Sequence, residues 1–215
     1  MRILFLVLLI LAALAALSLI IIFPLKLRKD KTAHRELVGR KLYRLAVKKD
    51  YYLLNNLVIK VDDEVTLHID HLLCADKYIY VVADRFYPLG ISGRPEDNTW
   101  FSYTGANKKT AIKNIVSINE ERTIRLAKFL GWNESKSPML ISVVCINDEL
   151  ALSSELAKFD RPYSFLVKKK NVAKRIAAAE SGAKVSPLDA ENLAKLVQTI
   201  HEISLQTSEP EKNDI

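Results

Sequence analysis

Residues 65–85 read VTLHIDHLLCADKYIYVVADR, and this stretch decides the fold of the chain. It holds two apolar runs of strand length, 65–74 and 78–85, joined by the polar pair Asp76-Lys77. A third apolar run, 52–59, precedes them across the acidic turn 62–64. Apolar runs of this length with short polar connections are typical of neighbouring antiparallel strands. The three runs therefore predict an antiparallel meander.

The remaining segments predict helices and further strands around this meander. Residues 139–146 form a continuous apolar run, which is typical of a strand buried on both faces of a sheet. Shorter strands are expected near 100–103 and 163–167, and helices over 31–49 and 108–130, with Gly131 ending the latter. Two more helices follow, the second beginning at Ser186-Pro187. The pattern predicts one α/β domain over 34–205 and a disordered tail over 206–215.

The first part of the chain has the composition of a membrane anchor. Residues 3–23 include no charged side chain, and twenty-one helical residues span about 30 Å, the thickness of the hydrocarbon core of a bilayer. A cleaved signal peptide is the alternative, but the run stays apolar to Phe23, beyond the usual length of such a segment. We therefore expect residues 1–25 to be an uncleaved transmembrane anchor in the lipid bilayer.

The positive charge of the chain is concentrated next to this anchor. The formal net charge is +7, and residues 24–50 carry ten Lys and Arg against three acids, whereas 51–215 carry 21 basic and 22 acidic residues. A uniformly basic nucleic-acid binder is therefore excluded. Basic residues flanking a membrane helix stay on the cytoplasmic side, which predicts a single-pass protein with a cytoplasmic domain. A signal-anchor placed by its N-terminus regardless of charge would give the opposite orientation.

Two basic clusters are candidates for binding nucleic acid or lipid, one in the basic juxtamembrane segment 26–50 and one in the last third of the chain. Their members are Lys26, Arg28, Lys29, Lys31, Lys168, Lys169 and Lys170. Cys74 and Cys145 lie in apolar strand-like runs and have no metal-binding spacing. The sequence has no glycine-rich phosphate loop and no catalytic triad, so no small-molecule substrate is evident.

Five short motifs over residues 39–126 occur in the order and spacing of a known family. They are Leu54-Asn55-Asn56-Leu57, Ile69-Asp70-His71, the apolar run from His71 to Arg85, Ile91-Ser92-Gly93 with Trp100, and a helical set of Asn114, Asn119 and Leu126. In these motifs the segment resembles the nuclease-related domain (NERD) family of the PD-(D/E)xK nuclease superfamily. The resemblance implies a restriction-endonuclease-like core, a mixed sheet flanked by helices, and a divalent-metal site that hydrolyses phosphodiesters.

The positions that the family uses for catalysis have mostly changed in this chain. Asp70 is kept, but Arg40 replaces the helix glutamate of the family, and Ala83 and Arg85 replace the glutamate and lysine of its E-x-K triplet. One carboxylate holds Mg²⁺ poorly. We therefore expect a vestigial site without a cofactor, in which Asp70 is the one family ligand that remains and pairs with Arg40 or Arg85.

Two carboxylates could restore a metal site. Asp84 is adjacent to the lost glutamate, but alternation along a strand places it on the face opposite Ala83 and Arg85. Glu36 lies one helical turn before Arg40, at the spacing of an i,i+4 ion pair with it. The sequence therefore favours a catalytically inactive binding or scaffold module with nucleic acid or protein as its partner. The alternatives are a membrane-tethered nuclease that uses Mg²⁺, and a purely structural subunit of a membrane complex.

Overall fold

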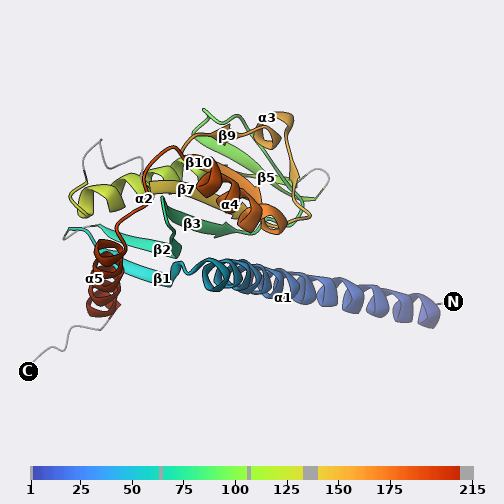
Figure 1. Cartoon of the computed structure of the whole chain (residues 1–215). Coiled ribbons are helices and arrows are strands. Elements are labelled where there is room, and N and C mark those ends of the chain that lie inside the picture. The colour runs from blue at the N-terminus through green and yellow to red at the C-terminus, as the bar shows by residue number, and fades with distance from the viewer. Residues whose placement is uncertain (1, 63–64, 106–107, 133–139, 209–215) are drawn as a thin grey trace, which may run out of the picture.

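Figure 1 shows the computed structural model, which describes residues 2–62, 65–105, 108–132 and 140–208, with their side chains from residue 25 to residue 207. The helices are α1 (Arg2–Lys49), α2 (Ile115–Phe129), α3 (Ser154–Ala157), α4 (Val172–Gly182) and α5 (Ala190–Ser208), with a short 3-10 turn at Lys169–Asn171. The strands are β1 (Tyr52–Lys60), β2 (Thr66–Cys74), β3 (Ile79–Arg85), β4 (Gly90–Ser92), β5 (Thr99–Gly105), β6 (Lys108–Lys113), β7 (Leu140–Ile146), β8 (Ala151–Leu152), β9 (Asp160–Arg161) and β10 (Ser164–Lys168).

A mixed sheet of six strands forms the centre of the domain, in the order β1-β2-β3-β7-β10-β9. The β1–β2 and β2–β3 pairs are antiparallel, and β7 is parallel to both β3 and β10. The predicted meander is thereby confirmed as β1 to β3. The prediction of a fully buried strand is confirmed as β7, all of whose residues are buried, while residue 139 lies outside the described residues.

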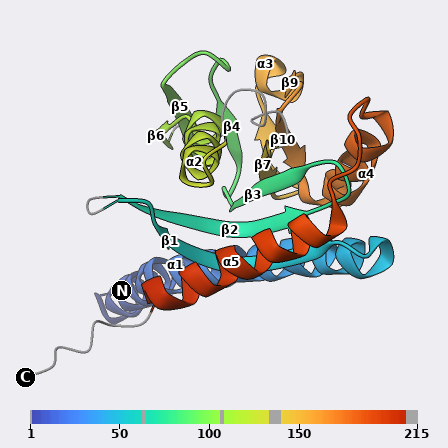
Figure 2. The ribbon, with the colours of Figure 1, turned by 60° about the vertical axis from the view of Figure 1, so that its left-hand side comes forward.

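Helices cover both faces of this sheet, and each face has its own apolar core. Val38 and Leu42 of α1 and Ile176 of α4 pack on one face, against Val82 and Val143. On the other face, Leu126 of α2 and the α5 residues Val197 and Ile200 pack against β1, β2 and β3. Figure 2 shows α1 and α5 running along the β1–β2 side of the sheet. The protein therefore has a mixed α/β fold with a central mixed sheet and flanking helices.

A second sheet, in the order β6-β5-β4-β8, packs on the first near α2. Its β6 strand corrects the prediction of a helix over 108–130, because Lys108–Lys113 pairs with β5 and the helix begins only at Ile115. The cause is the Asn114 side chain, which accepts hydrogen bonds from the backbone N–H groups of Val116 and Ser117 and so caps the helix there.

The ends of the last helix also differ from the prediction. The α5 helix begins at Ala190 instead of Ser186, because Asp189 caps it by accepting a hydrogen bond from the Asn192 N–H at 2.9 Å. The helix continues to Ser208, so the prediction of a disordered tail from 206 is wrong for 206–208, and residues 209–215 lie outside the described part of the chain.

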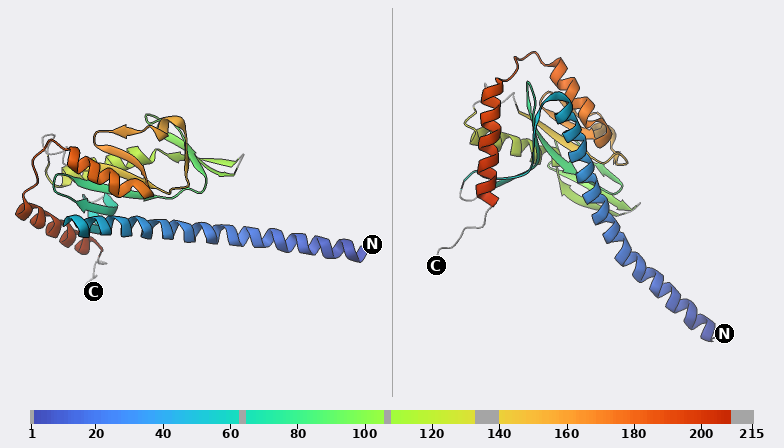
Figure 3. Two further views of the ribbon diagram at one scale, coloured as in Figure 1. Left: turned by 45° about the vertical axis from the view of Figure 1, so that its right-hand side comes forward. Right: turned by 60° about the horizontal axis from the view of Figure 1, so that its bottom comes forward.

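The helix predicted over 31–49 is the last part of α1, which runs without interruption from Arg2 to Lys49 and projects from the domain at its N-terminal end (Figure 3). Within the residues whose placement is described in full, no helix has a window apolar and long enough to cross a bilayer. The apolar run 3–23, where the anchor is predicted, lies outside those residues.

Candidate functional site

The predicted site carboxylate, Asp70, lies where two strands of the central sheet separate. The β2–β3 pairing ends at His71 and Val82, so Asp70 and Ala83 are just beyond it. In the gap, Asp70 Oδ2 accepts a hydrogen bond from Arg85 Nη1 at 2.8 Å and one from the Asp84 backbone N–H at 3.3 Å. The Asp70 side chain is only 20% exposed, so the Arg85 charge supports a largely buried carboxylate.

Asp84 faces the α1 side of the sheet, together with His71. Its Oδ2 lies 3.4 Å from His71 Nε2, and His71 Nδ1 lies 2.7 Å from the Asn55 Oδ1 atom. Burial acts to raise the pKa of Asp84, but the hydrogen bond and charge of His71 and the charges of Arg35 and Arg85 act against it. The net result is that the pKa of Asp84 lies below its ordinary value of 3.8. Asp84 is therefore ionised at neutral pH.

Arg35 of α1 joins the two carboxylates. Its Nη2 lies 3.7 Å from Asp70 Oδ1, its Nε lies 3.5 Å from Asp84 Oδ2, and it also donates a hydrogen bond to Asn56 Oδ1. The sequence reasoning did not single out Arg35. The available signal was the spacing of Arg28, Lys31 and Arg35, which places three cations on one face of a helix.

Arg35, Asp70 and Asp84 line an open cleft of about 650 Å³ between α1 and the end of β3. Its lining residues are Arg28, Lys31, Thr32, Arg35, Asp70, Asp84, Arg85, Phe86 and Tyr87. Arg122 of α2 lies close enough to interact electrostatically with Arg85 and Asp70. Its pKa is lowered by burial and by the Arg85 cation, against the influence of Asp70. The site therefore contains two carboxylates among a larger number of cations.

The other predicted site residues are placed as follows. Ala83 is buried next to Asp70 and offers no oxygen. Of the two cations proposed to pair with Asp70, Arg85 does so, whereas Arg40 pairs with Glu36 at 3.2 Å on the exposed side of α1. Glu36 is therefore engaged outside the cleft, and Asp84 is the second carboxylate near Asp70.

This arrangement does not fit a divalent metal. Both carboxylates contact Arg35, and Arg85 Nη1 lies 2.8 Å from Asp70 and 4.0 Å from Asp84, so guanidinium groups occupy the directions from which a cation would approach. Mg²⁺ requires near-octahedral oxygen ligands. In the described part of the chain, no three His, Cys, Asp or Glu side chains lie together as a metal-binding group. The cations around Asp70 and Asp84 are chemically suited to an anion rather than to a divalent cation.

Two of the motif residues, Gly93 and Asn119, make contacts that hold the fold together. A Cβ atom on Gly93 would lie 2.4 Å from Trp100 Cδ1, so the glycine lets the chain pass against the buried indole, whose Nε1 donates to the Arg94 carbonyl oxygen at 2.8 Å. Buried Asn119 donates to the carbonyl oxygen of Val81 at 2.9 Å and so ties α2 to the sheet. These two contacts hold the loop after β4 and helix α2 in place.

The basic cluster in the last third of the chain is largely engaged with Asp148. Lys168 Nζ donates to its carbonyl oxygen at 3.0 Å, Lys169 Nζ lies 3.6 Å from its carboxylate, and the Lys170 N–H donates to Oδ1 at 2.6 Å. Lys168 is the last residue of β10, and Lys169 and Lys170 are in the 3-10 turn that follows it. In the first cluster, Arg28 and Lys31 line the cleft, Lys26 lines a smaller hollow beside Phe86, and Lys29 is exposed.

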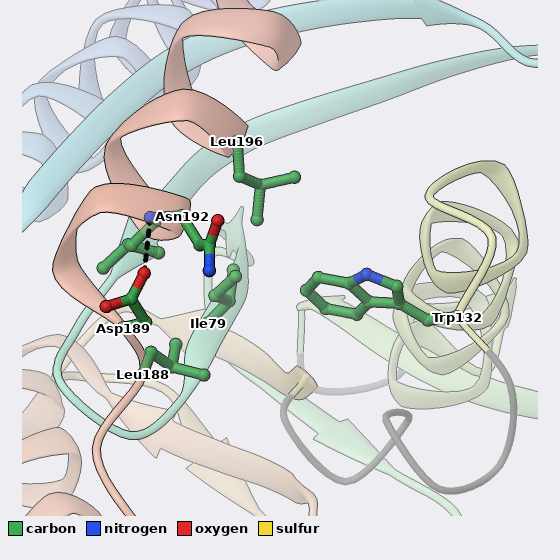
Figure 4. A pocket seen from close by; sticks show the side chains of 7 residues that line it. Ile79, Trp132, Leu188, Asp189, Asn192 and Leu196 are labelled. Carbon is green, nitrogen blue, oxygen red and sulfur yellow. Dashed lines mark hydrogen bonds between the residues drawn. The ribbon is translucent and has the colours of Figure 1, made fainter.

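A second hollow, of about 480 Å³, lies between the start of α5 and the residues that follow α2 (Figure 4). Trp132 forms one wall, and Leu188, Leu196 and Ile79 lie across from it. Its carboxylate, Asp189, is already the cap of α5. Among the lining residues that the structure describes, most are therefore apolar and none is a cation, which distinguishes this hollow from the cleft at Asp70.

Comparison with known proteins agrees with the motif pattern. Residues 31–147 match the family model described as NERD, nuclease-related domain. No curated protein matches the chain. Among solved structures, the crystal structure of a protein of unknown function, AF1548, is similar at 14% sequence identity and a TM-score of 0.30, over 81% of this chain and 90% of that one.

Proposed function

Because the chain belongs to the nuclease-related domain family, we propose that it is a membrane-anchored member whose domain binds a partner and does not cut nucleic acid. The domain has a restriction-endonuclease-like core in this proposal, held at the cytoplasmic face by a transmembrane helix over 3–23. One observation carries the loss of catalysis: Arg35 and Arg85 are paired with Asp70 and Asp84 where family members would place a metal ion.

The loss of catalysis follows from the chemistry that phosphodiester hydrolysis needs. A bound metal ion activates the attacking water and offsets the charge that develops on the scissile phosphate. Two guanidinium groups can offset charge, but a group that stays protonated at neutral pH cannot lower the pKa of a bound water as a metal does. With Ala83 in place of a glutamate, the E-x-K triplet has no carboxylate left that could bind a metal ion.

The test is a cleavage assay on the purified full chain in detergent, with single- and double-stranded DNA and RNA and with Mg²⁺ or Mn²⁺. We expect no cleavage above that of a mock preparation. Metal-dependent cleavage that disappears in Asp70→Ala and persists in Glu36→Gln would overturn the proposal. Resistance of the membrane-bound chain to carbonate extraction, and protease access to residues 25–215 from the cytoplasmic side only, test the anchor and its orientation.

A second candidate function is a nuclease with a rearranged metal site, and one observation favours it. Asp70 and Asp84 converge on the same two arginines from opposite faces of the sheet. If both arginines moved away, two carboxylates would share one ion, and the cleavage assay would detect this. The ion pairs described above favour the binding module.

A further inference from the structure

We propose that the cleft at Arg28, Lys31, Arg35 and Arg85 binds the phosphate group of an anionic lipid headgroup or of a small phosphate ester, and that it does so without a divalent metal. The inference deepens the proposed function, because it names the ligand of the binding module and places it at the vestigial site. It starts from the observation that most charged side chains at this site are cations, whereas the family's chemistry needs carboxylates that hold a metal ion.

The first argument is the charge of the cleft. Four of its lining side chains are cationic, namely Arg28, Lys31, Arg35 and Arg85, against two carboxylates. The carboxylates are engaged by Arg35 and Arg85. Arg28 and Lys31 form no ion pair with a carboxylate in the described part of the chain, so two cations at the cleft lack a counter-charge. A cleft lined by an excess of one charge concentrates the opposite charge.

The second argument is the kind of cation. Three of the four are arginines, whose planar guanidinium groups bind phosphate oxygens in pairs. They come from two elements, with Arg85 fixed at the end of β3 by Asp70 and Arg35 fixed on α1 by Asn56 and Asp84. The positions of Arg35 and Arg85 are thus set before a ligand arrives, which lowers the entropy lost on binding.

The third argument is the position of the cleft along α1. Arg28 and Lys31 follow the apolar run by five and eight residues, which places them about 7.5 and 12 Å beyond its end at the helical rise of 1.5 Å per residue. The headgroup layer on one side of a bilayer is about 5–7.5 Å thick. If residues 3–23 span the membrane, Arg28 therefore lies at the outer edge of the headgroup layer, and Lys31 lies about 4.5 Å further from the membrane.

The shape of the domain is consistent with this position. The β5–β6 hairpin extends from the domain toward the side on which the N-terminal end of α1 projects (Figures 1 and 3). The exposed residues Lys108 and Lys109 are on β6 of this hairpin. Leu89, which is 49% exposed, follows the cleft residues Phe86 and Tyr87 in sequence. A basic hairpin on that side would face the same anionic surface.

The experiment uses the full chain in detergent with excess EDTA, titrated with inorganic phosphate against sodium chloride of equal ionic strength. Thermal unfolding reports binding, since a ligand of the folded state raises the melting temperature. The test variant is Arg28→Gln/Lys31→Gln. The matched control is Lys48→Gln/Lys49→Gln, which removes the same charge from exposed positions of the same helix without touching the cleft. A second arm replaces phosphate with vesicles of phosphatidylcholine, with or without phosphatidate.

We expect phosphate to raise the melting temperature of the wild type and of the control. In the cleft variant the apparent Kd should weaken roughly tenfold or more for each cation removed, because a hydrogen bond to a charged group contributes at least this factor. Asp70→Asn removes a competing carboxylate and should tighten phosphate binding. A variant-dependent response to phosphatidate would identify a lipid headgroup, and a response to free phosphate alone would identify a soluble ester.

Three outcomes would overturn the inference: no response to phosphate or phosphatidate, an equal loss of response in the cleft variant and its control, or a response that needs Mg²⁺. Oligonucleotide binding that depends on Arg28 and Lys31 without any response to phosphate or phosphatidate would also overturn it, in favour of a nucleic-acid site. These failures are distinct from failure of the proposed function, which would show as metal-dependent cleavage or as release of the chain from membranes by carbonate.

Discussion

Replacing Asp70 by Asn tests the ion-pair network most simply, because the change removes a charge and keeps the shape. The amide oxygen can still accept the hydrogen bond from the Asp84 N–H, so the change mainly removes the charge that faces Arg85 at 2.8 Å and Arg35 at 3.7 Å. Removal leaves these two guanidinium groups and the nearby Arg122 with less negative charge between them.

The expected magnitude follows from burial and geometry. A hydrogen bond to a charged group contributes about 1.5–3 kcal/mol when it is buried. The Asp70 side chain is 20% exposed and the Arg85 side chain is 26% exposed, so solvent screens part of the interaction. We therefore expect Asp70→Asn to lower the free energy of unfolding by about 1–2 kcal/mol.

Urea unfolding of the full chain in detergent, followed by tryptophan fluorescence, measures this loss, since Trp100 is fully buried in the folded domain. The control is Glu36→Gln, which breaks an i,i+4 pair with Arg40 whose two side chains are 58% and 66% exposed. That change should cost only about 0–0.5 kcal/mol. Equal stability of Asp70→Asn, Glu36→Gln and the wild type would refute the idea that an ion-pair network has replaced the catalytic centre.

Three further predictions concern the same region. The pKa of Asp84 is lowered in the folded state, so its stabilising contribution is complete above the ordinary pKa of 3.8 and is lost as the pH falls through the lowered pKa. Urea unfolding of Asp84→Asn should therefore show a smaller loss of stability in acid than urea unfolding of the wild type. Identical dependence of stability on pH in the two proteins would contradict this. Gly93→Ala should lower the free energy of unfolding by about 1–3 kcal/mol, because its Cβ would lie 2.4 Å from the rigid Trp100 ring; a melting temperature unchanged from the wild type would show that the loop relaxes freely. Asn119→Ala should cost about 1–3 kcal/mol, because it leaves the buried Ser142 hydroxyl and a sheet carbonyl oxygen without their donor; chemical denaturation, with exposed Asn192→Ala as the comparison, measures the loss.

The three strands of the meander could be predicted from sequence because their signal is local. Each of the runs 52–59, 65–74 and 78–85 has strand length and a polar connection, and all three form the meander. The helix predicted over 108–130 was wrong at its start, because Lys108–Lys113 becomes a strand only by pairing with β5. Such a pairing is a tertiary contact, which local spacing of apolar residues does not show.

The site could be predicted only in part, for a related reason. The motif comparison identified Asp70, Ala83 and Arg85 as neighbours of one site, and strand alternation correctly placed Asp84 on the opposite face. The motif comparison did not show that Arg35 reaches both carboxylates, because this contact depends on how α1 crosses the end of the sheet. Arg40, which the motif places in the site, instead pairs with Glu36. Helix packing thus decided which arginine of α1 contacts Asp70 and Asp84.

The most direct test of the central claim is a titration of Mn²⁺ into the full chain, with free Mn²⁺ measured by electron paramagnetic resonance. If guanidinium groups have replaced the metal, the wild type and Asp70→Ala should bind equally little Mn²⁺ at neutral pH. A Mn²⁺ ion bound by the wild type and lost in Asp70→Ala would contradict the account, because it would show that Asp70 still holds a metal in the presence of Arg35 and Arg85.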